Sequence, residues 1–86
     1  MSILYSKYFL KRIQKRYGER PVLRTKVAKQ VATFCKNPRH PSLKTHKLKG
    51  RRQDQYSFWI EGNLRIVYIQ DGADVIITDI LTHDEY

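Results

Sequence analysis

Apolar side chains recur every three or four residues through residues 9–35, which is the spacing of amphipathic helices. Ser6 suits the N-cap of a first helix, which we expect to end near Gly18. Pro21 suits the first turn of a second helix, and Asn37-Pro38 ends it. Both helices should bury one face, formed by Phe9, Leu10, Ile13 and Tyr17 and then by Leu23, Val27, Val31 and Phe34, with Ala28, Ala32 and Cys35 alongside.

The rest of the chain contains apolar, β-branched segments separated by turn residues, a pattern typical of strands. Four segments fit strands: residues 3–5, 56–61, 64–70 and 74–81. Gly62-Asn63 suits a two-residue hairpin turn, and Asp71-Gly72-Ala73 makes the next turn. The last two strands are nearly continuous apolar runs, as in strands that are central or covered on both faces. The order β-α-α-β-β-β predicts an α+β fold, with two N-terminal helices packed on a small, mainly antiparallel sheet.

Residues 38–53 have no clear period and connect the helices to the last three strands. Leu43 and Leu48 are the residues that we expect to anchor this connection to the core. The segment is otherwise rich in cations, and a long basic loop on a small domain is a natural binding surface. With 86 residues, the chain should form a single domain, 1–86, with a modest core.

Charge divides the chain into two parts. Sixteen of the 17 Lys and Arg residues lie in the first 53 positions with one acid, Glu19, whereas the last 33 positions hold Arg65 and seven acids. The net charge is +9 and the pI is near 9.9. A surface of one sign attracts polyanions, and nucleic acid is the commonest of these. We therefore expect an acidic partner, either nucleic acid or an acidic protein.

Several classes of protein are disfavoured by the composition. The single Cys35 cannot form an internal disulfide, which fits a reducing compartment, and we expect it to be a small core residue. The N-terminus lacks the layout of a signal peptide, and no apolar run approaches a membrane span, so we expect a cytoplasmic protein that binds no membrane. The three His are far apart without helical i, i+4 spacing, so we expect no metal and no cofactor.

Two kinds of side chain could carry chemistry. Arg65 is a lone cation in an apolar strand, and it either forms an ion pair with Asp79 or Glu61 or serves as a fixed cation that stabilises a phosphorane-like transition state. His46 lies among the cations of the basic loop, and His83 follows the last strand. Either histidine could transfer protons, although a solvated loop and an incidental terminal histidine are the simpler interpretations.

These features coincide with those of a known family. The element order, the segments His46-Lys47-Leu48-Lys49-Gly50 and Leu64-Arg65-Ile66-Val67-Tyr68, and the closing Thr82-His83-Asp84-Glu85 together resemble the RelE/ParE superfamily of bacterial toxins. The chain is most similar to the small RelE/StbE, YafQ and YoeB-type mRNA interferases. The resemblance covers nearly the whole chain, and it implies a RelE-like fold and the toxin of a type II toxin–antitoxin system.

The resemblance also implies a mechanism. Such toxins are metal-independent endoribonucleases that typically cut mRNA in the ribosomal A site, and the 2′-hydroxyl of the RNA attacks the adjacent phosphate. It assigns the base to His46, the phosphate-binding cation to Arg65 and the acid to His83, and the two histidine roles can be exchanged. Contacts to the RNA backbone or to 16S ribosomal RNA are implied for Lys44, Lys47, Lys49, Arg51 and Arg52. Ring stacking on a substrate base is implied for Tyr56 or Tyr86.

The chain departs from the family at two places. YoeB-like members carry cations where this chain has Phe58 and Trp59, and many relatives have a valine between the acidic pair and the tyrosine that here follows directly as Tyr86. A cognate antitoxin is implied as a partner, usually an acidic segment that covers the basic surface. The alternatives are a ParE-like toxin that inhibits DNA gyrase without nuclease activity, and an inactive RNA-binding remnant. His46 and His83 beside Arg65 favour RNA cleavage.

Overall fold

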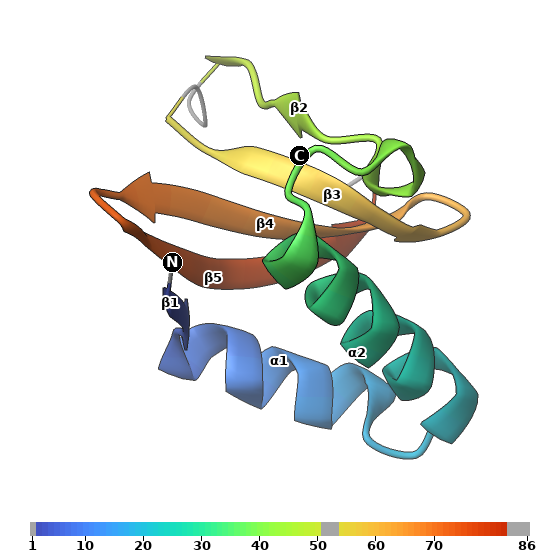
Figure 1. Cartoon of the computed structure of the whole chain (residues 1–86). Coiled ribbons are helices and arrows are strands. Elements are labelled where there is room, and N and C mark those ends of the chain that lie inside the picture. Colours follow the sequence, from blue (N-terminus) through green and yellow to red (C-terminus); the bar gives the residue numbers. More distant parts are fainter. Residues whose placement is uncertain (1, 51–53, 83–86) are drawn as a thin grey trace.

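A computed structural model describes residues 2–50 and 54–82 of the chain (Figure 1). The elements are β1 (Ser2–Tyr5), α1 (Lys7–Tyr17), α2 (Pro21–Lys36), the 3-10 helix η1 (Pro41–Leu43), β2 (His46–Lys47), β3 (Tyr56–Glu61), β4 (Leu64–Asp71) and β5 (Asp74–Thr82). The predicted α+β fold is confirmed, with two N-terminal helices and a mainly antiparallel sheet. Two short elements in the connection, η1 and β2, are additions that the sequence pattern does not predict.

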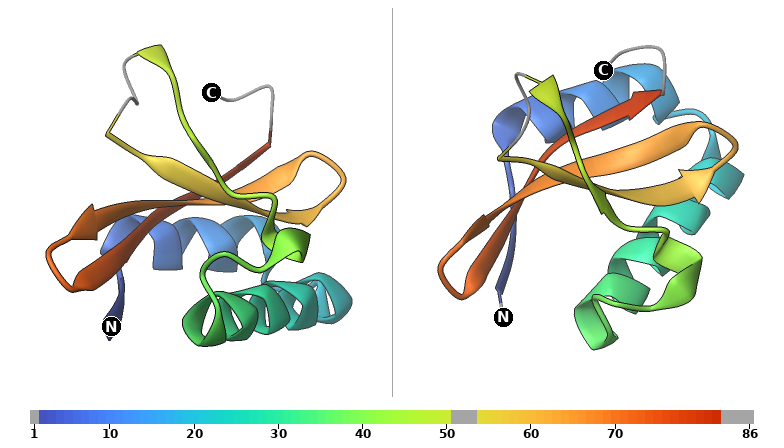
Figure 2. Two further views of the ribbon diagram at one scale, coloured as in Figure 1. Left: turned by 45° about the horizontal axis from the view of Figure 1, so that its top comes forward. Right: turned by 90° about the horizontal axis from the view of Figure 1, so that it is seen from above.

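The strands form one five-stranded sheet in the order β1-β5-β4-β3-β2. Strands β3, β4 and β5 make an antiparallel meander, β2 pairs with β3 antiparallel, and β1 pairs with β5 parallel. Both helices cover one face of the sheet, and the chain around β2 rises over the other face (Figure 1, Figure 2). Within residues 2–50 and 54–82, no helix combines the length and the hydropathy needed to cross a membrane.

Ser6 fixes the start of α1 to the sheet. Its hydroxyl accepts a hydrogen bond from the backbone N–H of Phe9 at 3.0 Å, as predicted for an N-cap, and donates to the carbonyl of Thr78 at 3.2 Å. The helix ends at Gly18, where a Cβ would lie 2.4 Å from the carbonyl oxygen of Gln14. Only glycine therefore fits this close turn without a shift of the backbone.

The buried stripes of the two helices differ from the predicted stripes. Leu10 of α1 is 50% exposed, and Ala28 and Ala32 of α2 are exposed, so their predicted burial is wrong. Leu23, Val27 and Phe34 are buried as expected. Cys35 is exposed, so its predicted place in the core is wrong: it lies about 100° around the helix from Phe34, on the solvent side. Gln30 is buried instead, and its Nε2 donates to the carbonyl of Trp59 at 2.8 Å and to that of Ser42 at 3.3 Å.

Apolar clusters lie on both faces of the sheet. The main core fills the space between the helices and the sheet, and Leu43 belongs to it. On the opposite face, Leu48 packs with Val67 and Leu81 in a second, smaller cluster. Leu43 and Leu48 are 0% and 5% exposed, so both predicted anchors are confirmed. Because β4 is covered on both faces, its side chains form a continuous apolar run rather than an alternating one.

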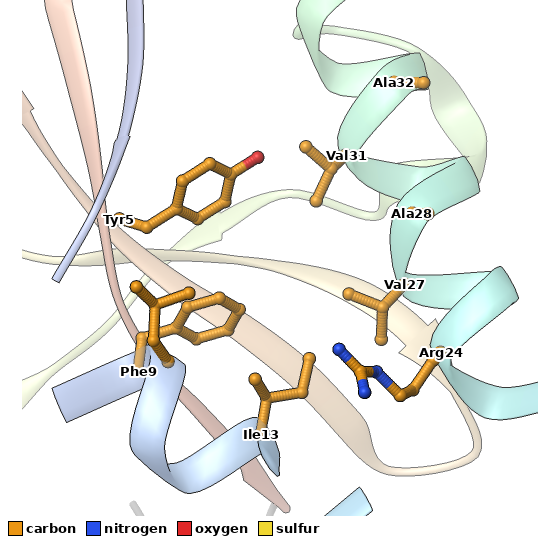
Figure 3. A pocket seen from close by; sticks show the side chains of 9 residues that line it. Tyr5, Phe9, Ile13, Arg24, Val27, Ala28, Val31 and Ala32 are labelled. Carbon is orange, nitrogen blue, oxygen red and sulfur yellow. The ribbon is translucent and has the colours of Figure 1, made fainter. Parts of the chain in front are cut away.

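An apolar cavity of about 380 Å³ opens between α1 and α2 (Figure 3). Phe9 and Ile13 of α1 face Val27 and Val31 of α2 across it, and the ring of Tyr5 closes one side. Arg24 lies at its edge, where Nη1 donates to Oε1 of Gln14 at 3.2 Å. We call this the interhelical cavity.

Candidate functional site

The centre of the candidate site is Arg65, which lies in β4 with only 8% of its surface exposed. A buried guanidinium is costly unless its N–H groups are hydrogen-bonded. Its Nε donates to Oγ of Ser57 at 2.7 Å, and Nη2 donates to the carbonyl of Ser57 at 3.3 Å and to the carbonyl of Lys44. The orientation of the guanidinium is therefore fixed by β3 and by Lys44, two residues before β2.

A β-bulge in β3 determines which side chains share a face with Arg65. Glu61 pairs with Leu64 across the turn, but Arg65 then pairs with Trp59, so Ile60 is the extra residue. Without this bulge, Ile60 would lie opposite Arg65, and the residues of β3 that precede Ile60 would each point to the other face. The bulge therefore places the hydroxyl of Ser57 on the face of the guanidinium.

The two carboxylates that the sequence offers as ion-pair partners for Arg65 are bound by other cations. Asp79 accepts from Nη1 of Arg12 at 3.0 and 3.2 Å. Glu61 accepts from Nζ of Lys26 at 2.8 Å, and this hydrogen bond lowers the pKa of Glu61 below its usual value. The fixed cation is therefore the interpretation of Arg65 that the geometry favours.

His46 contacts the same guanidinium from β2. Its Nδ1 lies 3.3 Å from Nη2 of Arg65, and the pairing of His46 with Ser57 brings the ring to this place. Because a guanidinium can only donate, this contact is a hydrogen bond only when Nδ1 keeps its lone pair. The proton of a neutral ring is then on Nε2. The structure thus brings together two residues that the sequence singles out, Arg65 and His46, from strands on either side of β3.

Lys44 has an unusual backbone conformation beside the guanidinium. Among the non-glycine residues that the structure describes, it alone has a positive φ, of 46°. A left-handed conformation costs about 1 kcal/mol or more outside glycine, and such strain often marks a functional site. In this conformation the carbonyl reaches Arg65, while Nζ lies 4.6 Å from the centre of the Trp59 ring. The sequence predicts only a phosphate contact for Lys44, so its positioning role is new.

The remaining predicted site residues fall into three groups. Lys47 and Lys49 are exposed on either side of the buried Leu48, where they are accessible to a polyanion. Tyr56 is not brought to the guanidinium, because its ring lies on the helix side of the sheet and stacks on Tyr68 with centroids 5.6 Å apart. Four others lie outside the described residues: Arg51, Arg52, His83 and Tyr86.

Sequence reasoning missed Ser57, the residue that holds Nε of Arg65. Ser57 is fully buried, and a small hydroxyl residue between Tyr56 and Phe58 is the one signal of a special role. Its partner could not be found from the pattern, because a regular hairpin without the bulge would turn Ser57 away from Arg65. Within residues 2–50 and 54–82, no three His, Cys, Asp or Glu side chains gather as a metal site would require.

Comparison with known proteins shows similarity in structure alone. No protein-family model and no curated protein sequence matches the chain. A YoeB/ParE toxin from Agrobacterium tumefaciens superposes with a TM-score of 0.80 and 16% identity, over 96% of this chain and 99% of the other. A chain of the YoeB–YefM complex from Staphylococcus aureus superposes with a TM-score of 0.76 and 20% identity, over 96% of this chain and 97% of the other. YafQ from E. coli superposes with a TM-score of 0.68 and 21% identity, over 98% of this chain and 94% of the other.

These superpositions cover nearly the whole chain, and the chain has the RelE/ParE-like toxin fold. The sequence resemblance to that fold is therefore confirmed. Structures with this fold include toxins bound to antitoxins, the YoeB–YefM and DinJ–YafQ complexes.

Proposed function

We propose that this protein is the toxin of a type II toxin–antitoxin system and that it cleaves mRNA on the ribosome without a metal ion. The observation that carries the proposal is the buried guanidinium of Arg65, fixed by Ser57 and Lys44 and in contact with His46. The RelE/ParE-like fold and the basic connection between α2 and β3 support it. The protein would act in the cytoplasm, where mRNA and ribosomes are found.

Arg65 would stabilise the charge that develops on the scissile phosphate. When the 2′-oxygen attacks, negative charge accumulates on the phosphate oxygens, and a positioned donor lowers the barrier most when it needs no reorganisation. The planar guanidinium suits two phosphate oxygens at once, which a lysine ammonium does not. Its orientation is set before substrate arrives, since Ser57 and Lys44 hold Nε and Nη2.

His46 would act as the base, released by the substrate itself. Nδ1 lies 3.3 Å from Nη2 of Arg65, and in the neutral tautomer with its proton on Nε2 the lone pair of Nδ1 faces this donor. A phosphate oxygen that binds Nη2 would replace this contact, and Nδ1 could then take the proton of the 2′-hydroxyl. His83, which follows Thr82 directly in the sequence, would give a proton to the leaving 5′-oxygen. The products would be a 2′,3′-cyclic phosphate and a 5′-hydroxyl.

The cations of the connection would hold the RNA backbone. Lys47 and Lys49 are exposed, and no acidic residue occurs between Arg20 and Arg52 in the sequence. Contacts of this kind position RNA without reading its sequence. We assign them to mRNA or 16S ribosomal RNA, together with Lys44, Arg51 and Arg52.

The cleavage test is primer extension on mRNA in a purified translation system. The wild-type protein should produce cuts aligned with codons, and only when ribosomes are present. Arg65→Lys keeps the charge but loses the planar guanidinium, and His83→Ala removes the proposed acid. Each of these single variants should lower the cleavage rate by roughly 100-fold or more. Lys15→Gln is the control, because Lys15 is exposed on α1, under the helix face of the sheet, and should leave the rate unchanged.

A folded wild-type protein that makes no cut in the presence of ribosomes would contradict the proposal. Inhibition of DNA gyrase supercoiling by that protein would then favour the ParE-like alternative. RNA binding without cleavage or gyrase inhibition would indicate an inactive remnant.

An antitoxin would be the protein partner, as YefM is for YoeB and DinJ for YafQ. The interhelical cavity offers an apolar surface between two basic helices, with Arg24 at its edge. An amphipathic helix with acidic flanks is complementary to such a surface.

We therefore expect Ala28→Glu, which places a carboxylate in the cavity, to prevent co-purification with the product of a neighbouring gene. Val22→Glu is the control, since Val22 is 71% exposed on the same helix and does not line the cavity. Equal co-purification of both variants would contradict this placement.

A further inference from the structure

A second cavity, of about 560 Å³, lies beneath the segment that links α2 to β2. Tyr56 and Tyr68 line it from the sheet, and Arg39, His40 and Lys44 line it from the linking segment. We call it the tyrosine cavity. Its volume is in the range of sites that hold a small molecule or a single nucleotide.

The hydroxyl of Tyr68 makes no hydrogen bond to any residue in 2–50 or 54–82, although 94% of the residue is buried. The ring is well packed, with Phe34 at 4.9 Å and Tyr56 at 5.6 Å between centroids. Packing therefore explains the ring but not the polar group, and phenylalanine would serve the core equally well. A tyrosine hydroxyl normally has a hydrogen-bond partner, so a hydroxyl without a protein partner, in a residue that lines a cavity, is available to a ligand.

The protonation state of Tyr68 suits a donor. Burial, with a smaller effect from the neighbouring Tyr56, raises the pKa of Tyr68 to about 12. The hydroxyl therefore keeps its proton at neutral pH and can donate to an acceptor on a ligand.

The other walls of the cavity define the class of ligand. The ring of Tyr56 is only partly buried, so it offers an aromatic wall for a flat heterocycle. Arg39 and Lys44 are exposed cations, and neither has an acidic neighbour in the sequence between Arg20 and Arg52. His40 is also exposed, and its Nδ1 accepts from the backbone N–H of Ser42 at 3.1 Å. An aromatic wall, a hydroxyl donor and two cations are the groups that bind an unpaired nucleotide.

The tyrosine cavity is connected to the Arg65 site through the chain itself. Lys44 lines the cavity and its carbonyl accepts from Arg65, while Thr45 lines the cavity and precedes His46. An RNA strand that passes over residues 44–46 would therefore reach both places.

We propose that the tyrosine cavity binds a nucleotide that flanks the cleaved bond, with its base against Tyr56 and its phosphate near Arg39 and Lys44. The hydroxyl of Tyr68 donates to an acceptor of the base, so this cavity contributes to the choice of cleavage site. The identity of the strand rests on the proposed function, whereas nucleotide binding in the cavity does not require cleavage.

The test is a titration of isotope-labelled protein with each of the four nucleoside 5′-monophosphates, followed by NMR shifts of the backbone amides of Arg39, Lys44 and Thr45. At least one nucleotide should give saturable shifts. Tyr68→Phe removes one oxygen and keeps the packing, and it should weaken binding of that nucleotide by roughly 5- to 100-fold. Tyr8→Phe is the matched control, because Tyr8 is 58% exposed on α1 and outside the cavity.

Inorganic phosphate and the 2′-deoxynucleotides complete the design. Phosphate that binds as tightly as the nucleotides would reveal an anion site only and would overturn the proposal, as would unchanged binding by Tyr68→Phe. Weaker binding of the 2′-deoxynucleotides would identify RNA as the strand. His83→Ala separates the two proposals, since it should lower the cleavage rate by roughly 100-fold or more while nucleotide binding in the cavity persists.

Discussion

Neutral groups of the protein help to fix the side chain of Arg65. Ser57 and Lys44 bind the guanidinium through an uncharged hydroxyl and uncharged carbonyls. A carboxylate at the same place would hold the side chain equally well, but it would cancel the field that a phosphate experiences. Asp79 lies on the neighbouring strand β5 and is instead held by Arg12 of α1. The cost of burying Arg65 is therefore consistent with a role in binding anions.

Tyr68 makes stability sensitive to alkaline pH. Its pKa is about 12 in the folded protein, whereas an exposed tyrosine titrates near 10. Between these values the unfolded chain loses a proton that the folded chain keeps, so the free energy of unfolding falls as pH rises through this window. Titration of this residue should lower the free energy of unfolding of the wild type by roughly 1–2 kcal/mol, and Tyr68→Phe should not show this contribution. Urea unfolding of both proteins at about pH 8 and about pH 11.5 measures it, and a difference that does not change with pH would contradict this account.

At the scale of elements, the helices and the three long strands could be predicted because each carries its own periodic pattern. Ser6, Gly18 and the Gly62-Asn63 turn gave boundaries that agree with the structure to within about a residue. Strand β2 could not be predicted, because a two-residue strand has no period. It exists because Leu43 and Leu48 anchor the connection on either side of it and because its backbone pairs with β3.

The candidate site could be predicted as a set of residues but not as an arrangement. Arg65 was identifiable as a cation out of place in an apolar strand, and His46 as an imidazole in a basic loop. Their contact depends on the bulge at Ile60 and on the pairing of β2 with β3, which are properties of the sheet rather than of any one segment. The position of Cys35 was mistaken for a related reason, since an apolar neighbour in sequence is not a neighbour on a helix face.

At the scale of the whole molecule, the basic connection predicts RNA binding that depends steeply on salt. Each phosphate contact on a single strand adds about 0.7 to the slope of log affinity against log salt concentration. The double variant Lys47→Gln/Lys49→Gln should therefore reduce the slope by about 1.4. Fluorescence anisotropy of a labelled RNA between about 50 and 200 mM salt measures it.

The control for this measurement is Lys11→Gln/Lys15→Gln, which removes the same charge from the exposed face of α1. Helix α1 lies on one face of the sheet, and the chain around β2 rises over the other face (Figure 1). The salt dependence of RNA binding by this control variant should therefore equal that of the wild type. Equal reductions in both variants would show that RNA binds the net charge of the protein rather than the connection.

The parallel pairing of β1 with β5 joins positions 72 residues apart, from Ser2 with Asp74 to Tyr5 with Ile77. Such a distant contact closes late in folding, because the entropy of bringing the two segments together must be overcome first. Until then, β5 presents an unpaired edge along an apolar run that includes Val75, Ile77 and Ile80. An open apolar edge is a template for strands of other chains. We therefore expect the four residues of β1 to protect the nascent sheet against self-association, and we expect slow or failed docking of β1 to lead to aggregation rather than to a loosened monomer.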